Sequence, residues 1–106
     1  LAQGPNFFIF MNNTITSEKL EKYFKITKEA LDMVNKKGVD EKRKKEALDF
    51  LDMAERYYSD AQHFKNKGEI VTAFAALNYA HGWLDAGARA KLFKVTDSRL
   101  FTVDEE

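Results

Sequence analysis

Two histidines and their neighbours are the residues of this chain best placed to do chemistry. His63 lies three residues after Asp60, and His81 lies four residues before Asp85, so each pair shares one face of a helix. Histidine and carboxylate side chains at such spacings occur in metal sites, in acid–base sites and in buried polar networks. These two pairs are therefore the first candidates for a functional site.

The sequence lacks the further ligands and catalytic motifs that a metal centre or an active site built on these pairs would need. Dimetal sites in helical bundles use a Glu-x-x-His motif from each of two helices and a Glu from each of the others, and neither repeat occurs here. The chain has no cysteine, which excludes thiolate zinc sites, disulfides and cysteine nucleophiles. It also has no HExxH motif, Gly-rich phosphate loop, nucleophile elbow or EF-hand loop. We therefore expect no catalytic residues, no metal and no cofactor.

A polar network that fixes helix register is the favoured interpretation of the histidine region, with a ligand pocket as the alternative. If two helices pair around Gly68, Asp60 comes to the level of Asn78 to His81. A buried imidazole needs a partner for each ring nitrogen. The residues assigned to this network or pocket are Tyr57, Asp60, Asn78, His81, Asp85 and Arg89.

The helix that contains His81 is apolar on two sides. One stripe comprises Ile70, Phe74, Leu77, His81, Leu84 and Ala88, and the second comprises Ala76, Tyr79, Trp83, Ala86 and Ala90. A three-helix bundle needs only one wide stripe from each helix. Either neighbouring helices and terminal segments cover the second stripe, or it docks on a partner. The candidate interface comprises Tyr79, Trp83, Ala86 and Ala90, with the aromatic pair as anchors.

A basic run surrounds the first expected turn between helices. It comprises Lys36, Lys37, Lys42, Arg43, Lys44 and Lys45. Cations are disfavoured at the beginning of a helix, so the last four are a mild sign of contact with phosphate or nucleic acid. The alternative is a solvated helix end that Glu41 and Glu46 compensate.

Hydrophobic spacing predicts the helices that carry these residues. The first begins after the N-cap Thr16 and ends before Gly38, and the second begins after the cap Asp40 and ends at Gly68. The third runs from about Glu69 to Phe93. Because short connections force neighbouring helices to be antiparallel, we expect an all-α, up-down-up three-helix bundle over residues 16–95. An extended segment, residues 1–15, precedes it, and a C-terminal tail, residues 96–106, follows.

Length and charge agree with a single small domain. The chain has 106 residues, and its 17 basic and 17 acidic residues leave no net charge to steer nucleic acid to the whole molecule. The apolar run 7–11 is too short to span a membrane and lacks the pattern of a signal peptide. Together with the absence of cysteine, this favours the cytoplasm. Met11 is a candidate natural start, in which case the residues before it are dispensable.

A segment of about 40 residues carries a more specific pattern. Tyr57 and Tyr58 are followed by Asp60, a Lys67-Gly68 turn and the run NYAHGWLDAG, and the pattern ends at Val95. On these residues the chain resembles the archaeal domain of unknown function 357 family. The resemblance implies an archaeal, cytoplasmic three-helix bundle and implies no activity.

A weaker likeness is to the helical domains that accompany minimal nucleotidyltransferases in prokaryotes. Their ribonuclease members carry an arginine followed, after four to six residues, by a histidine. Arg56 and His63 have six residues between them and meet that spacing, whereas the positions upstream of His81 hold only Phe74, Ala75 and Ala76.

The sequence thus supports two functional hypotheses. A third hypothesis, an enzyme, is the least favoured. The first is a non-catalytic interaction module that docks through the third helix onto a protein partner or a second copy of itself. The alternative is a module that binds nucleic acid or nucleotides through the basic run.

Overall fold

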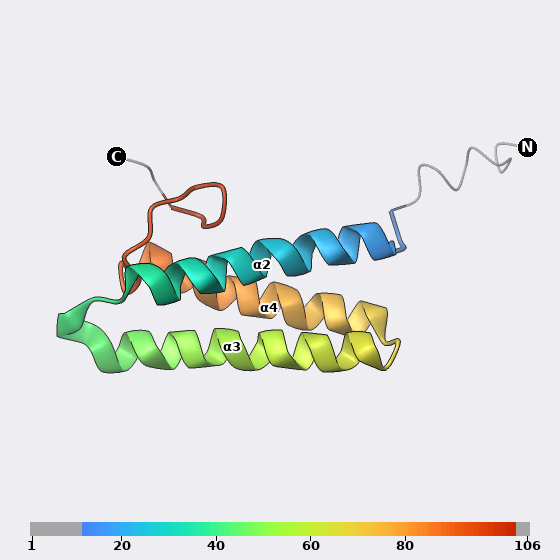
Figure 1. The fold of residues 1–106 in the computed structure, drawn as a ribbon, viewed down its shortest axis with the longest axis horizontal. Helices are drawn as coiled ribbons and strands as arrows, with labels where there is room; N and C mark the ends of the chain where they lie inside the picture. Colours follow the sequence, from blue (N-terminus) through green and yellow to red (C-terminus); the bar gives the residue numbers. More distant parts are fainter. Residues whose placement is uncertain (1–11, 104–106) are drawn as a thin grey trace, which may run out of the picture.

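The computed structural model describes residues 12–103, which contain three long helices. Helix α2 spans Ser17–Lys37, α3 spans Lys44–Asn66 and α4 spans Ile70–Arg89, with a short 3-10 turn, η1, at Glu41–Arg43. Successive helices run antiparallel (Figure 1), and α3 and α4 share the largest interface. The predicted all-α, up-down-up three-helix bundle is confirmed. Most of the expected N-terminal segment, including the apolar run 7–11, lies outside the described residues.

Local chemistry explains where α2 begins and ends. The Thr16 hydroxyl accepts a hydrogen bond from the backbone N–H of Lys19 at 3.1 Å, which caps the first turn of the helix. Gly38 adopts a left-handed φ of 91° at the other end, where its N–H reaches the Val34 carbonyl. Both predicted boundaries of this helix are confirmed.

Two other predicted boundaries are wrong. Asp40 caps the 3-10 turn rather than α3, because the backbone at Arg43 departs from helical geometry and delays α3 to Lys44. The third helix ends at Arg89 rather than near Phe93. Lys91 adopts a left-handed φ of 60°, and the Leu92 N–H bonds back to the Gly87 carbonyl at 2.9 Å, which turns the chain onto the bundle.

The buried sides of α3 and α4 are rich in small residues. Buried residues recur at every seventh position of both helices: Ala47, Ala54 and Ala61 in α3, and Ala73, Ala80 and Gly87 in α4. Small side chains allow two helix axes to approach closely. The core of α4 is therefore centred on its small residues rather than on the large residues of the predicted stripe.

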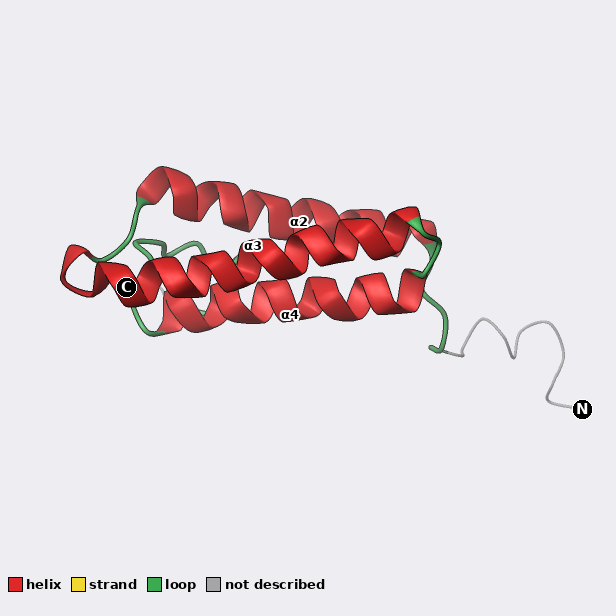
Figure 2. Cartoon of the chain, turned by 90° about the horizontal axis from the view of Figure 1, so that it is seen from below, coloured by secondary structure: helices red, strands yellow, loops and turns green. Residues whose placement is uncertain are grey.

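The segment after α4 completes the core. Leu92, Phe93, Leu100 and Phe101 are each no more than 2% exposed and pack in one cluster with residues such as Leu84. Figure 2 shows this segment as a loop at one end of the bundle. Burying each such side chain contributes roughly 1.5–3 kcal/mol. Residues 96–103, expected to form part of a tail, are thus a structural part of the bundle.

Within residues 12–103, no helix combines the length and apolar character that a membrane span requires.

Candidate functional site

The outer side of α4 is exposed and carries no charged residue as far as Ala86, and the exposed Arg89 lies on the same side in the last turn. We define the open face of α4 as Val71, Thr72, Ala75, Asn78, Tyr79, Gly82 and Ala86, which are all the exposed residues of this helix before Arg89. They lie within about one third of the helix circumference. Val71 is 73% exposed and Tyr79 is 64% exposed. The exposed positions of α2 and α3 are, by contrast, mostly charged.

Aromatic side chains from α3 support one edge of this face. The Tyr79 ring stacks on Tyr57 at a centroid distance of 5.1 Å, and Trp83 meets Phe50 edge to face at 5.1 Å. Trp83 is therefore partly covered, whereas Tyr79 stands open. A shallow apolar depression lies between Asn78, Tyr79, Gly82, Trp83 and Ala86.

The structure divides the second stripe predicted for this helix. Ala76 is 9% exposed and packs in the core. The four residues of the candidate interface reach the outer side, with Ala86 and Ala90 exposed beside Tyr79 and Trp83. Neighbouring helices therefore cover the edge of the stripe at Ala76 and part of Trp83, and leave the other edge open.

Gly82 lies in the middle of the open face without an internal reason to be glycine. Apart from its two chain neighbours and the backbone of its own helix, a Cβ built at this position meets no atom of the chain within 4 Å. Glycine inside a helix costs about 0.5–1 kcal/mol relative to alanine. The packing of the chain itself therefore does not explain this residue.

On its inner side, α4 carries a polar cluster that joins three parts of the chain. His81 Nε2 donates a hydrogen bond to the Leu100 carbonyl at 2.6 Å, because a carbonyl oxygen can only accept. In the neutral ring, Nδ1 then accepts from the buried Thr27 hydroxyl of α2 at 3.0 Å. Asp85 accepts from the backbone N–H of Thr102 at 2.9 Å and from its hydroxyl at 3.2 Å. The cluster thus holds α2 and the C-terminal segment against α4.

Only part of the predicted network meets in this cluster. His81 Nε2 lies 3.8 Å from Asp85 Oδ1. Arg89 and these two residues line one surface hollow. Tyr57 instead stacks on the outer side of α4, while Asp60 and Asn78 are exposed. The expected approach of α3 to His81 does not occur, because α2 and the C-terminal segment occupy that side of α4.

Sequence reasoning missed the partners that complete the cluster. Thr27 carried a usable signal, because a hydroxyl within the apolar stripe of the first helix needs a partner once it is buried. For the Leu100 carbonyl and Thr102, the sequence contained no such signal. Among residues 12–103, no group of three or more histidine and carboxylate side chains is arranged to hold a metal ion.

The arginine–histidine pair of the weaker likeness lies on the exposed side of α3. Arg56 Nε bonds the Asp52 carboxylate at 2.9 Å, and both side chains are more than half exposed. His63 is also exposed and touches the ring of Phe64. Their surroundings are those of solvated surface side chains.

The basic run gains further cations from the other end of the chain. Val39 and Phe93 form an isolated antiparallel bridge, and the Lys94 N–H bonds the Gly38 carbonyl at 3.0 Å. This pairing places Lys91 and Lys94 beside the loop that follows α2. We call these two lysines and the basic run together the basic end.

One cation of the basic end has a structural role. Arg43 Nε bonds Asp40 Oδ2 at 2.8 Å, and its guanidinium also donates to the Lys91 carbonyl at 3.0 Å. The Arg43 hydrogen bond, followed by the backbone N–H of Lys42, lowers the pKa of Asp40 from its ordinary value. Lys36, Lys37, Lys42, Lys44 and Lys45 are all exposed.

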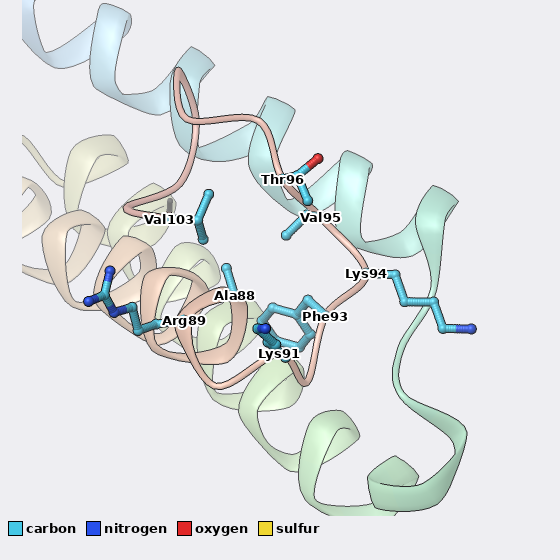
Figure 3. A pocket seen from close by; sticks show the side chains of 8 residues that line it. All are labelled: Ala88, Arg89, Lys91, Phe93, Lys94, Val95, Thr96 and Val103. Carbon is cyan, nitrogen blue, oxygen red and sulfur yellow. The ribbon is translucent and has the colours of Figure 1, made fainter. Parts of the chain in front are cut away.

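A hollow of about 600 Å³ opens next to the basic end. It is lined by Ala88, Arg89, Lys91, Phe93, Lys94, Val95, Thr96 and Val103. In Figure 3 the apolar side chains surround the hollow, while Arg89 and Lys94 lie at opposite edges. Its lining therefore combines apolar side chains with three cationic residues, Arg89, Lys91 and Lys94.

The family comparison agrees with this architecture. The family described as Protein of unknown function (DUF357) matches residues 22–93, which include most of α2 and all of α3 and α4. The chain belongs to this family. It matches no curated protein and no solved structure at a significant level. The family match begins 35 residues before the pattern of Tyr57 to Val95, ends two residues short of it and assigns no activity.

Proposed function

We propose that this DUF357 protein is a non-catalytic interaction module that docks through the open face of α4. The observation that carries the proposal is a helix face that is exposed and free of charge from Val71 to Ala86, on which Tyr79 is 64% exposed and no other segment lies within 4 Å of a Cβ added at Gly82. Docking on this face removes apolar surface from water and desolvates no ion.

The aromatic residues at the edge support the same function. Tyrosine and tryptophan are the side chains that most often anchor protein interfaces. Tyr79 and Trp83 are already held by Tyr57 and Phe50 of α3, at 5.1 Å in both pairs. Because the rings are positioned before binding, less conformational entropy is lost when a partner docks.

The basic end supports a second candidate, contact with phosphate or nucleic acid. The observation that favours it is the pairing of the two loops, because it brings the segment that contains Lys91 and Lys94 against the loop between α2 and α3, which carries Lys42. Phosphate contacts release counterions, so such binding must weaken as the salt concentration rises.

A comparative capture experiment separates the two candidates. Tagged protein is incubated with native lysate at low and high salt, with and without nuclease, in three forms: unchanged, Tyr79→Lys and Ser59→Lys. Both substitutions place a lysine at an exposed helix position, but Ser59 lies on α3, outside the open face.

The proposal predicts that a discrete protein is bound by the unchanged and Ser59→Lys forms and lost from Tyr79→Lys, regardless of nuclease. Capture of RNA or DNA that nuclease and salt remove, and that Tyr79→Lys leaves unaffected, would instead assign the function to the basic end.

A further inference from the structure

We propose that the hollow of about 600 Å³ at the end of α4 binds a small organic anion, in which an apolar group carries one phosphate or carboxylate. We call it the C-terminal hollow. The proposal goes beyond docking on the open face, because Phe93, Val95 and Val103 line the hollow from the segment that follows α4. Its volume lies within the range of about 300–1,000 Å³ that is usual for ligand pockets.

The charge of the lining selects the sign of the ligand. Arg89, Lys91 and Lys94 line the C-terminal hollow, and none of its described lining residues is acidic. Ammonium and guanidinium groups bind phosphate and carboxylate through charge-assisted hydrogen bonds. A cationic ligand would meet like charges here, and a neutral ligand would gain nothing from them. The complementary ligand is therefore an anion.

The floor of the C-terminal hollow is apolar and already ordered. Ala88, Phe93 and Val95 are no more than 6% exposed, because they pack in the main core cluster. Val103 packs against the same cluster and is only partly buried. In Figure 3 these four side chains lie around the hollow. Because this floor favours apolar contact but leaves little surface open, the ligand should carry a small apolar group beside its charge.

The backbone of Lys91 supports the assignment. Lys91 follows the C-cap of α4 and adopts a left-handed φ of 60°. Its N–H bonds the Ala88 carbonyl at 3.1 Å. The Leu92 N–H bonds the Gly87 carbonyl at 2.9 Å, which completes a Schellman motif. Glycine is the usual residue at this position, because a side chain is strained there. The lysine thus keeps an ammonium group at the hollow although glycine would suit the turn better.

The loop between α2 and α3 fixes the backbone of both lysines. The Arg43 guanidinium donates to the Lys91 carbonyl at 3.0 Å, and the Lys94 N–H donates to the Gly38 carbonyl at 3.0 Å. Less conformational entropy is therefore lost when a ligand binds. Both lysine side chains are exposed, so their ammonium groups can adjust to the position of the anion.

An NMR titration of isotope-labelled protein is the first test. The probes are octyl phosphate, octanoate, octanol, octylammonium and inorganic phosphate, each below the concentration at which it forms micelles. Octyl phosphate or octanoate should shift the amide signals of residues 91–96 and 103 in a saturable manner. The tighter of these two shows whether the head group is a phosphate or a carboxylate. The other three probes should bind several-fold more weakly.

Three outcomes of this titration overturn the proposal. Equal binding of octanol removes the role of charge, and equal binding of inorganic phosphate removes the role of the apolar floor. Shifts confined to residues 42–45, or no saturable shift up to millimolar concentrations, would show that the C-terminal hollow is not the site.

Lys91→Gly separates ligand binding from the architecture of the turn. Glycine relieves the left-handed strain, so this variant should unfold at a higher urea concentration than the unchanged protein. Its affinity for octyl phosphate should nevertheless fall about three- to tenfold, because one ammonium group is lost. Thr96→Glu, which adds a carboxylate at an exposed lining position, should weaken binding in the same way.

Two control variants complete the experiment. Lys67→Gln removes a lysine at the opposite end of α4, and Tyr79→Lys changes the open face, so both should bind octyl phosphate like the unchanged protein. Unchanged affinity in Lys91→Gly, or an equal loss in Lys67→Gln, overturns the proposal. Loss of binding in Tyr79→Lys would place the probe on the open face and also overturn it, whereas the docking function is judged separately by protein capture.

Discussion

Gly82 and Gly87 lie in the same helix, on opposite sides of it, and meet opposite surroundings. A Cβ at Gly87 would collide with the ring of Phe93, which packs directly against the backbone there. A Cβ at Gly82 would meet no atom within 4 Å. The first glycine is thus explained by the fold of the chain, and the second is not.

This difference separates the two sides of α4. On the inner side, small residues and His81 serve the bundle, since they admit α3, α2 and the returning C-terminal segment. On the open face, no other segment of the chain packs against Gly82, and Ala86 is exposed. Residues of similar type therefore have different roles according to what approaches them, and the following predictions test that separation.

The largest effect is expected from removing the ring that Gly87 accommodates. Phe93 is 2% exposed, so Phe93→Ala should lower the free energy of unfolding by about 3–5 kcal/mol. Urea unfolding of dilute protein measures this loss. A loss below 1 kcal/mol would show that the ring does not hold the C-terminal segment on the bundle.

Gly87→Ala should destabilise the protein by about 2 kcal/mol, because the added methyl group forces Phe93 to move. The same change in the Phe93→Ala background should be neutral or slightly stabilising, since the collision is gone and alanine favours helix. A double-mutant cycle by urea unfolding gives the coupling between the two sites. Equal effects in both backgrounds would contradict the explanation of Gly87.

His81→Leu should lower the free energy of unfolding by about 1–3 kcal/mol, because the buried Thr27 hydroxyl loses its partner. Amide hydrogen exchange should also speed up in residues 97–103, which lose the bond from His81 to the Leu100 carbonyl. As the matched control on the open face, Asn78→Leu should change neither measurement. Faster exchange in both variants would remove the distinction between the two sides.

The smallest effect concerns the link at the basic end. The pKa of Asp40 is lowered by Arg43, so the stabilisation that this carboxylate provides is present above its unfolded pKa and is lost as pH falls through its folded pKa. Asp40→Asn should therefore be slightly less stable than the unchanged protein near neutral pH, and the difference should disappear in strong acid. Urea unfolding at several pH values checks this. A difference independent of pH would assign the effect to shape rather than charge.

The sequence was sufficient for the three helices and for those of their boundaries that rest on local chemistry. Thr16, Gly38 and Gly68 act through capping or a left-handed φ, which neighbouring residues alone determine. The end of α4 was missed because Lys91 adopts a left-handed φ that is unusual for a residue other than glycine.

The candidate site was only partly predictable, for a different physical reason. A stripe gives the face of one helix but not the rotation of its neighbours, so Tyr57 and Asp60 were placed near His81 although α2 occupies that position. The burial of Leu100 and Phe101 depends on a turn and a backbone bridge between distant segments, which no periodicity signals. Gly82 lies within the NYAHGWLDAG run, but only the structure reveals its surroundings.

Gly82→Ala tests the central claim most directly when stability and binding are measured on the same preparation. If the open face is a docking surface, Gly82→Ala should change stability and binding in opposite directions. The free energy of unfolding of the dilute protein, measured with urea, should rise by about 0.5–1 kcal/mol, because alanine favours helix. At the same time, the protein bound in the capture experiment falls, because the added methyl group blocks close approach. A variant that gains stability and binds its partner as well as before would contradict the claim that Gly82 belongs to a docking surface.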